Sequence, residues 1–272
     1  MPLDASSDSP AIEQHNQEIH ENLQHWERKP ELQEEYASFY QLIAAHLPPP
    51  AQGPVLECGS GIGNLKSAFP TAITSDLFPN PWLDRQENVY ALSYADRSLA
   101  GVVLFDVLHH LRFPGRSLNE LERVLQPDGR VVIMEPAAGL LGRIMLGLFH
   151  HEPLALRDKI TWAAPPLFDP TNIDYYAAQG NAWRIFGSQR SQFPLPGWTI
   201  QKVQYLPALP WLLTGGFRGP CLNRGVLRPV IKGLDALLRC APRLFASRMI
   251  VVLTKSKGRR EAASAQFPCI IA

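Results

Sequence analysis

A glycine-rich run stands early in the chain, directly after four residues that have the pattern of a buried strand. The residues Val55-Leu56-Glu57-Cys58 lead into Gly59-Ser60-Gly61-Ile62-Gly63-Asn64, and a helix is expected after them. Glycines let the backbone turn tightly and approach a ligand, because no Cβ is in the way. A strand, a glycine loop and a helix in this order indicate a nucleotide-cofactor site; a glycine turn without any ligand is the alternative.

The spacing of the glycines separates two kinds of nucleotide cofactor. A dinucleotide fold requires G-x-G-x-x-G, and this chain has Asn64 at the position of the third glycine. The acid Glu57 precedes the glycines, and a carboxylate at the mouth of the loop suits a cationic ligand but would repel a pyrophosphate. The pattern therefore disfavours a nucleotide-dependent oxidoreductase.

Histidines provide the candidates for proton transfer near neutral pH. His109 and His110 follow a strand-like run directly, and a second cluster comprises His150, His151 and Glu152. Adjacent helical residues point about 100° apart, so at most one of the first pair should face a pocket. We favour His109 as the catalytic base, with His110 and His151 as the alternatives, and plain packing or capping as the rival role. The second cluster has no third ligand at a recognisable distance, so no metal is predicted.

Short apolar runs that end in acidic residues define the expected sheet. After residues 55–58 come Ala72 to Asp76, Gly101 to Asp106 and Arg130 to Glu135, and a helix is predicted from Pro114 to Leu125. Strands that alternate with helices predict an α/β fold with a doubly wound, mostly parallel sheet. Trp198 to Tyr205 and Arg248 to Lys255 alternate well enough to be two late strands. Ligands bind at the carboxyl ends of such strands.

The remaining segments are expected to surround this sheet. Residues 1–18 have the composition of a disordered lead-in, and 257–272 form a loose tail. Apolar periodicity predicts one helix from Ile19 to Leu47. Its Trp26, Tyr36 and Tyr40 are interpreted as a cover over the cofactor or as plain core. The catalytic domain thus spans residues 19–256, with the helical cover at 19–50 and substrate-side insertions at 137–197 and 206–247.

The amino-acid composition indicates which kinds of partner and which cellular compartment to expect. The chain of 272 residues carries 26 Lys and Arg against 25 Asp and Glu, which gives no electrostatic footprint for nucleic acid. The four cysteines show no paired spacing, which favours a reducing, cytoplasmic compartment. The N-terminus lacks the pattern of a secretory signal. The longest apolar stretch, Ala137 to Phe149, is too short to span a bilayer, which leaves peripheral membrane contact open.

Several motifs together resemble one known family, the class I S-adenosylmethionine (SAM) methyltransferases, and within it the methyltransferase type 11 group. The similarity covers residues 50–136. It is carried by the E-x-G-x-G-x-G form of the glycine loop and by Gly63-Asn64-Leu65-Lys66, Phe69-Pro70, Thr74-Ser75-Asp76, Asp106-Val107-Leu108-His109-His110-Leu111, residues 123–130 and Met134-Glu135-Pro136. The resemblance implies a seven-stranded sheet with a final antiparallel hairpin, which the two late strands supply.

The resemblance also implies the cofactor, SAM, and the residues that contact it. Glu57 precedes the loop, in which Gly59, Gly61 and Gly63 line the methionine and ribose portion. Asp76 holds both ribose hydroxyls, unless it is a helix cap or turn residue. The run from Asn88 and Val89 to Tyr94 matches the family's D-A-x-x-L-P-F, so Asn88 replaces an acid, and its side-chain oxygen would accept from the adenine amine. Asp106 lies beside the methionine end or caps the following helix.

The sequence thus predicts a SAM-dependent methyltransferase that acts on a small or lipid-like metabolite. Oxygen is the preferred acceptor atom and carbon the second, and a hydroxyl or an acidic carbon needs a base. The alternatives are a catalytically inactive SAM-fold binding protein and the oxidoreductase disfavoured above. The insertion from Leu206 to Phe245 is expected to form an apolar cap over the acceptor site. Its apolar run, which includes Trp211, Leu212 and Phe217, would form a lipid-facing cap, since basic residues flank it, or would pack on the sheet in the ordinary way.

Overall fold

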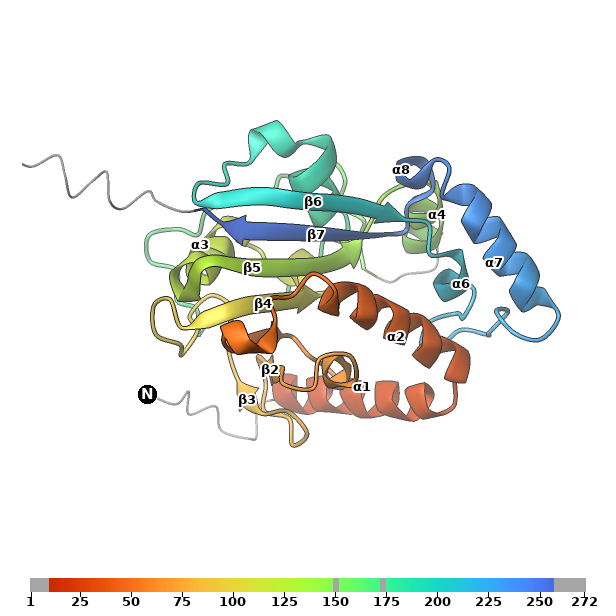
Figure 1. Ribbon diagram of the computed structural model, residues 1–272, viewed down its shortest axis with the longest axis horizontal. Coiled ribbons are helices and arrows are strands. Elements are labelled where there is room, and N and C mark those ends of the chain that lie inside the picture. Colours follow the sequence, from red (N-terminus) through yellow and green to blue (C-terminus); the bar gives the residue numbers. More distant parts are fainter. Residues whose placement is uncertain (1–9, 149–151, 172–174, 257–272) are drawn as a thin grey trace, which may run out of the picture.

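One seven-stranded sheet organises the molecule (Figure 1). The computed structural model describes residues 10–148, 152–171 and 175–256. The strands have the order β3-β2-β1-β4-β5-β7-β6. They are β1 (Val55–Cys58), β2 (Ile73–Asp76), β3 (Arg85–Gln86), β4 (Leu99–Phe105), β5 (Leu125–Pro136), β6 (Trp198–Leu206) and β7 (Arg248–Lys255). The strands β1 to β5 are parallel to one another, and β7 runs antiparallel to both β5 and β6. The predicted doubly wound sheet with a final antiparallel hairpin is confirmed.

The helices pack on both faces of this sheet, and the alternation of β4 shows why. Val103 and Phe105 pack on one side with residues of helix α2, whereas Val102 and Leu104 pack on the other side with helix α3. The longer helices are α1 (Pro10–Glu27), α2 (Pro30–Ala44), α3 (Pro114–Val124), α4 (Leu140–Leu148) and α7 (Leu227–Leu238). The short ones are α5 (Asn181–Trp183), α6 (Leu209–Leu212), α8 (Pro242–Phe245) and the turns η1 (Pro50–Gln52), η2 (Asn64–Ser67), η3 (Leu108–His110), η4 (Arg184–Ser188) and η5 (Arg190–Gln192). A strand buried on both faces is expected to be apolar along its length, which matches the continuous apolar run of β4 and, apart from Glu57, the residues of β1.

The N-terminal region differs from the expectation of one helix starting at Ile19. The structure has two helices, α1 and α2, because Pro30 lacks the N–H that would continue a helix and instead occupies the first turn of α2. Residues 10–18, for which the composition indicated a disordered lead-in, belong to α1.

The insertions lie where the acceptor side of the sheet is expected. The segment between β5 and β6 contains α4, α5, η4 and η5, and the segment between β6 and β7 contains α6, α7 and α8. Helix α7 lies at the outer edge of the molecule, at the end to which β4 and β5 point (Figure 1). Among the described residues, no helix is both long and apolar enough to cross a bilayer.

Candidate active site

The glycine loop joins the carboxyl end of β1 to the turn η2, and its backbone conformation requires glycine. Gly59, Gly61 and Gly63 all have positive φ, of 69°, 52° and 76°, a region that disfavours residues with a Cβ. A Cβ on Gly59 would also lie 2.4 Å from the Val107 side chain. The loop can therefore turn tightly at the carboxyl end of β1, and its glycines put no side chain between the backbone and a ligand.

Three side chains hold this loop in place. Asp76, at the end of β2, accepts hydrogen bonds from the N–H of Gly61 at 3.0 Å and of Leu77 at 2.7 Å, one on each carboxylate oxygen. The side chains of Asn80 and Trp82 both donate to the carbonyl of Gly61, at 3.3 and 3.1 Å. Each oxygen of a carboxylate can accept more than one hydrogen bond.

The two N-terminal helices cover the loop and the strand ends. On α1, the Ile19 side chain lies 3.7 Å from the Cβ position of Gly61, and His20 packs edge-on against Trp82 at 5.2 Å. On α2, Tyr36 stacks on Phe105 with ring centroids 5.5 Å apart. Burial raises the pKa of Tyr40, and the nearby carboxylates of Glu57 and Asp106 raise it further. The aromatic residues of α2 therefore lie close to Glu57 and Asp106, and they are also part of the hydrophobic core.

Glu57 is a buried acid with one carboxylate oxygen, Oε2, that lacks a hydrogen-bond partner among the described residues. Burial raises the pKa of Glu57 to about 8, although the Ser60 hydroxyl lowers it in part, and the charge of Asp76 raises it again. The group is therefore largely protonated at neutral pH. A cation bound at the loop would favour the ionised form and occupy this side of the pocket.

Glu57 should make the stability of the free protein depend on pH. Because its pKa is higher in the folded state than the ordinary glutamate value of 4.5, the folded protein binds more protons between that value and about 8. The free energy of unfolding should consequently fall as the pH rises through this window. A Glu57→Gln variant should lose this component, so its stability relative to wild type should rise by roughly 4 kcal/mol between pH 5 and pH 9. Urea unfolding at both pH values measures the difference.

Glu27→Gln, a substitution of an exposed glutamate, serves as the control. Parallel pH profiles of stability for Glu57→Gln and wild type would contradict the assignment.

The residues predicted to meet the adenine lie just beyond β3. Asn88 is buried; its Oδ1 accepts from the N–H of Tyr90 at 2.9 Å, and its Nδ2 donates to the carbonyl of Pro170 at 2.6 Å. Val89 is buried beside it. The Oδ1 of Asn88 keeps one lone pair for an amine. Asn88 also ties this turn to the insertion after β5, a contact that the sequence motif did not indicate.

Asp106 follows β4 in the left-handed region, with φ 57°, and forms a bidentate ion pair with Arg248, the first residue of β7. The two pairs of atoms are 2.8 and 3.0 Å apart. Arg248 is fully buried, and its guanidinium lies over the rings of Phe39, Phe105 and Trp211. Burial lowers the pKa of Arg248, but the charge of Asp106 outweighs it and the net shift is upward. The pair positions the carboxylate at the strand end.

His109 and Glu135 form a buried dyad at the ends of β4 and β5. Nδ1 of His109 lies 2.7 Å from Oε2 of Glu135, whose Oε1 accepts from the backbone N–H of Val107 and Leu108. An ionised carboxylate only accepts hydrogen bonds, so Nδ1 carries the proton and the neutral ring offers its lone pair on Nε2. Burial lowers the pKa of His109, but the Glu135 carboxylate outweighs it, so the net shift is upward from 6.5.

A second carboxylate, Glu152, faces both histidines from the insertion after β5. Its oxygens lie 3.7 Å from Nε2 of His109 and 3.8 Å from Nε2 of His110, beyond hydrogen-bond distance. Burial raises the pKa of Glu152, but the hydroxyl of Tyr175 and both histidines lower it, and the net shift is downward. Nδ1 of His110 donates to the carbonyl of Tyr176 at 3.0 Å, while burial and the charge of His109 lower the pKa of His110.

The structure brings most of the predicted site residues to one edge of the sheet. The loop glycines, Asp76, Asp106 and His109 all follow the carboxyl ends of adjacent strands. His151 lies outside the described residues. Sequence reasoning did not find Arg248, Asn80, Trp82, Tyr175 or Gln179. One feature of the sequence could have indicated Arg248. A charged residue at the start of an otherwise apolar strand must have a buried partner.

Comparison with known proteins agrees with this geometry. A family model described as a methyltransferase domain matches residues 25–184, more than half of the chain. The fold is similar to that of a SAM-dependent methyltransferase from Thermotoga maritima, described as a possible histamine N-methyltransferase. The two share 15% identity over 88% of this chain and 99% of that one, with a TM-score of 0.51. A putative S-adenosylmethionine-dependent methyltransferase from Listeria monocytogenes has 12% identity, 82% and 100% coverage and a TM-score of 0.46. No curated protein has a significantly similar sequence.

The chain belongs to the methyltransferase-domain family, and it is a SAM-dependent methyltransferase. Its cofactor is S-adenosylmethionine. The residues at the glycine loop fit this cofactor in two respects. The loop of positive-φ glycines leaves room for close approach of a ligand, and the unpartnered oxygen of Glu57 lies where a cation would satisfy it.

Proposed function

We propose that this enzyme methylates an acceptor that must lose a proton, most favourably a hydroxyl oxygen and secondarily an acidic carbon. The acceptor is a small or lipid-like metabolite. The observation that carries the proposal is the His109–Glu135 dyad at the strand ends next to the glycine loop. An amine acceptor would make little use of such a base.

His109 is the base in this proposal, and the site supports that role on both of its nitrogens. SAM bound at the glycine loop would supply a methyl group on a sulfonium, which is an activated leaving group. Nε2 of His109 takes the acceptor proton, while Glu135 holds Nδ1–H and fixes the ring. The resulting imidazolium lies between the carboxylates of Glu135 and Glu152, which stabilise its charge.

Glu152, Tyr175 and Gln179 close the outer side of this pocket. Tyr175 and Gln179 both donate to the Glu152 carboxylate, and the segment that carries them packs over the histidines. The cysteines described by the structure are free thiols, which supports a reducing, cytoplasmic compartment for the reaction.

Mass spectrometry can test the function directly. A cell extract, separated into lipid and polar fractions, is supplied with SAM and the wild-type protein or a His109→Ala variant. A methylated product should gain about 14 daltons relative to its precursor, and the gain should depend on His109. Chemical derivatisation then distinguishes methyl ethers or esters from carbon-methylated products. A product methylated on nitrogen, or no product in either fraction, would contradict the proposal.

Asp76 should contribute strongly to SAM affinity. Replacing it by alanine removes charge-assisted hydrogen bonds to two ribose hydroxyls and should weaken binding by about 2 kcal/mol, or roughly 30-fold. Isothermal calorimetry measures the dissociation constants of SAM and S-adenosylhomocysteine.

Asp84→Ala provides a matched control for that measurement. Asp84 is also a carboxylate beside β2 and accepts from the N–H of Thr74 at 2.8 Å, but it pairs outward with Lys66. Its loss should change SAM affinity by less than about threefold. Equal losses in the two variants would show that Asp76 acts only through the stability of β2.

A further inference from the structure

The exposed apolar side chains of the described residues are concentrated at one end of the molecule. Of the twelve large ones, seven lie between residues 222 and 244 and three lie on α4. The seven are Leu222, Val226, Leu227, Val230, Leu234, Leu237 and Leu244. We call them, together with Leu140, Ile144 and Leu148 of α4, the apolar end surface. Soluble monomers rarely expose such a contiguous set.

Helical spacing explains how this surface arises. On α7, residues 227, 230, 234 and 237 recur every three or four positions and share one face. The opposite side of α7 is buried through Ile231 and Asp235, and the Asp235 carboxylate accepts from the N–H of Leu209 on α6. Helix α7 is therefore fixed to the body of the protein with an apolar face turned outward. Helix α4 lies next to it through α8, since the N–H of Gly142 donates to Ala246 at 3.1 Å.

The location differs from the one that the sequence indicated. Trp211 and Phe217 were expected to face lipid, but Trp211 packs edge-on against Phe39 and Phe217 packs against Tyr36. Leu212 is buried. The first half of the insertion is thus core that joins α6 to α2, because its aromatic residues find partners on α2. The exposed apolar residues lie in the second half.

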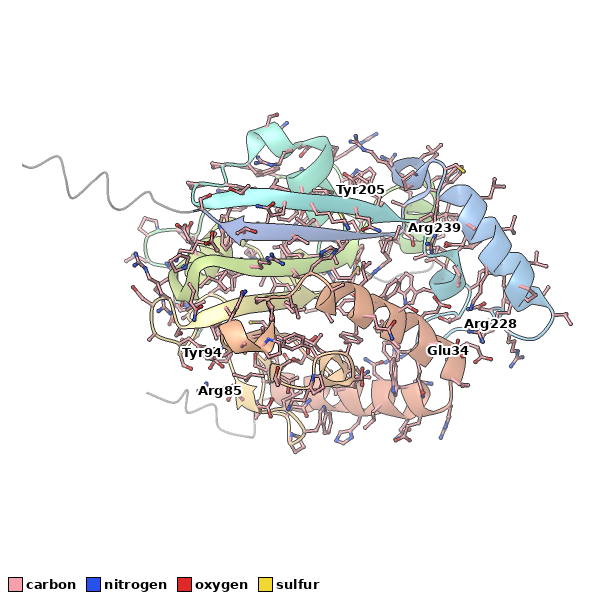
Figure 2. The ribbon with its side chains drawn as sticks, in the orientation of Figure 1. Glu34, Arg85, Tyr94, Tyr205, Arg228 and Arg239 are labelled. Atoms are coloured by element: carbon pink, nitrogen blue, oxygen red, sulfur yellow. The ribbon has the colours of Figure 1, made fainter. Side chains whose placement is uncertain are left out.

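The charge around this surface is strongly positive. Residues 222–245 contain five basic residues and one acid, Asp235. Arg228 turns back toward Glu34 on α2 (Figure 2), and Arg239 pairs with Asp235. Arg224, Lys232 and Arg243 are exposed beside the apolar face. Two copies of this surface would bring like charges together, which disfavours self-association.

We propose that the apolar end surface binds an anionic membrane, with the apolar face of α7 in the interfacial layer and the basic residues against lipid headgroups. An outward-facing amphipathic helix with flanking Arg and Lys has the features of an interfacial helix. Helix α7 projects at the edge of the molecule (Figure 1), so it can lie on a flat surface. The end of the molecule that carries it is also the end to which β4 and β5 point, and an acceptor drawn from the membrane would have a short path to His109.

Vesicle co-sedimentation of the full chain, without SAM or acceptor, tests this proposal independently of methyl transfer. Wild type should sediment with vesicles of phosphatidylcholine and phosphatidylglycerol and much less with phosphatidylcholine alone. About 1 M salt should weaken the binding, because the Debye length then shortens to ~3 Å. The double variant Val230→Ser, Leu234→Ser should partition at least roughly tenfold more weakly. Arg224→Gln with Lys232→Gln should reduce the preference for the anionic vesicles.

Leu167→Ser is the matched control, because Leu167 is 97% exposed and lies outside the apolar end surface. It should sediment like wild type. Both serine variants change exposed side chains, and circular dichroism confirms that they fold. The proposal is overturned if wild type fails to bind the anionic vesicles at low salt, or if the double variant binds as well as wild type. It is equally overturned if light scattering shows a dimer that the double variant converts to a monomer, since the surface would then join two copies of this chain.

Discussion

Replacing His109 by alanine should lower turnover roughly 10²–10⁴-fold and leave SAM affinity nearly unchanged. The imidazole is 3% exposed and contacts the Glu135 carboxylate at the end of β5, so its removal deletes the proton acceptor without touching the glycine loop. Steady-state kinetics and calorimetry measure the two quantities separately. His110→Ala is the control, because Nδ1 of His110 is held by the Tyr176 carbonyl, and its effect should be much smaller.

The pH profile distinguishes a base from a packing residue. In wild type, kcat/KM should fall as the pH drops through the pKa of His109, which the Glu135 carboxylate raises above 6.5. Glu135→Gln keeps an acceptor oxygen for the backbone N–H groups of Val107 and Leu108 but loses the charge. The acid limb of that variant should therefore move to lower pH. If the acid limb of the pH profile stays in place in Glu135→Gln, or persists in His109→Ala, the base is a group other than His109.

The parallel part of the fold could be predicted because local pattern determines it. The run at Val55–Cys58 was placed to the residue, since a strand buried on both faces leaves a continuous apolar signal before a glycine loop. The two-residue strand Arg85–Gln86 could not be predicted, because it is polar and too short to show alternation. The break at Pro30 was missed because the apolar periodicity continues across it.

The residues of the site also divide into those that local sequence patterns indicate and those that they do not. Asp76 and His109 lie in short motifs at or just after strand ends, so the family resemblance could name Asp76 as a candidate, and its position after a strand could name His109. The groups that tune them come from distant segments. Arg248 is 142 residues from Asp106 in sequence, and Glu152 reaches the histidines from a segment without periodicity. Such pairs depend on strand order and loop path, which no local pattern encodes.

The Asp106–Arg248 pair should be the most sensitive point of the fold in this site. Asp106→Asn leaves the buried guanidinium of Arg248 without a compensating charge, which typically costs about 3–5 kcal/mol. Asparagine tolerates the left-handed backbone that φ 57° requires, so the substitution changes the charge and not the turn. Urea unfolding without cofactor measures the loss.

The double variant Asp106→Asn, Arg248→Met should recover most of that stability. Methionine is apolar and flexible and can occupy the space among Phe39, Phe105 and Trp211, whose rings now face the guanidinium at 4.9 to 5.6 Å. Replacing a buried ion pair by apolar groups is often neutral, whereas removing one partner is not. The single Arg248→Met should fall in between, because the Asp106 side chain is 31% exposed and water can solvate its charge. A double-mutant cycle then gives the coupling between the two residues. If Asp106→Asn costs less than about 1 kcal/mol, or the double variant is as unstable as Asp106→Asn alone, charge compensation is not what holds Asp106 at the strand end.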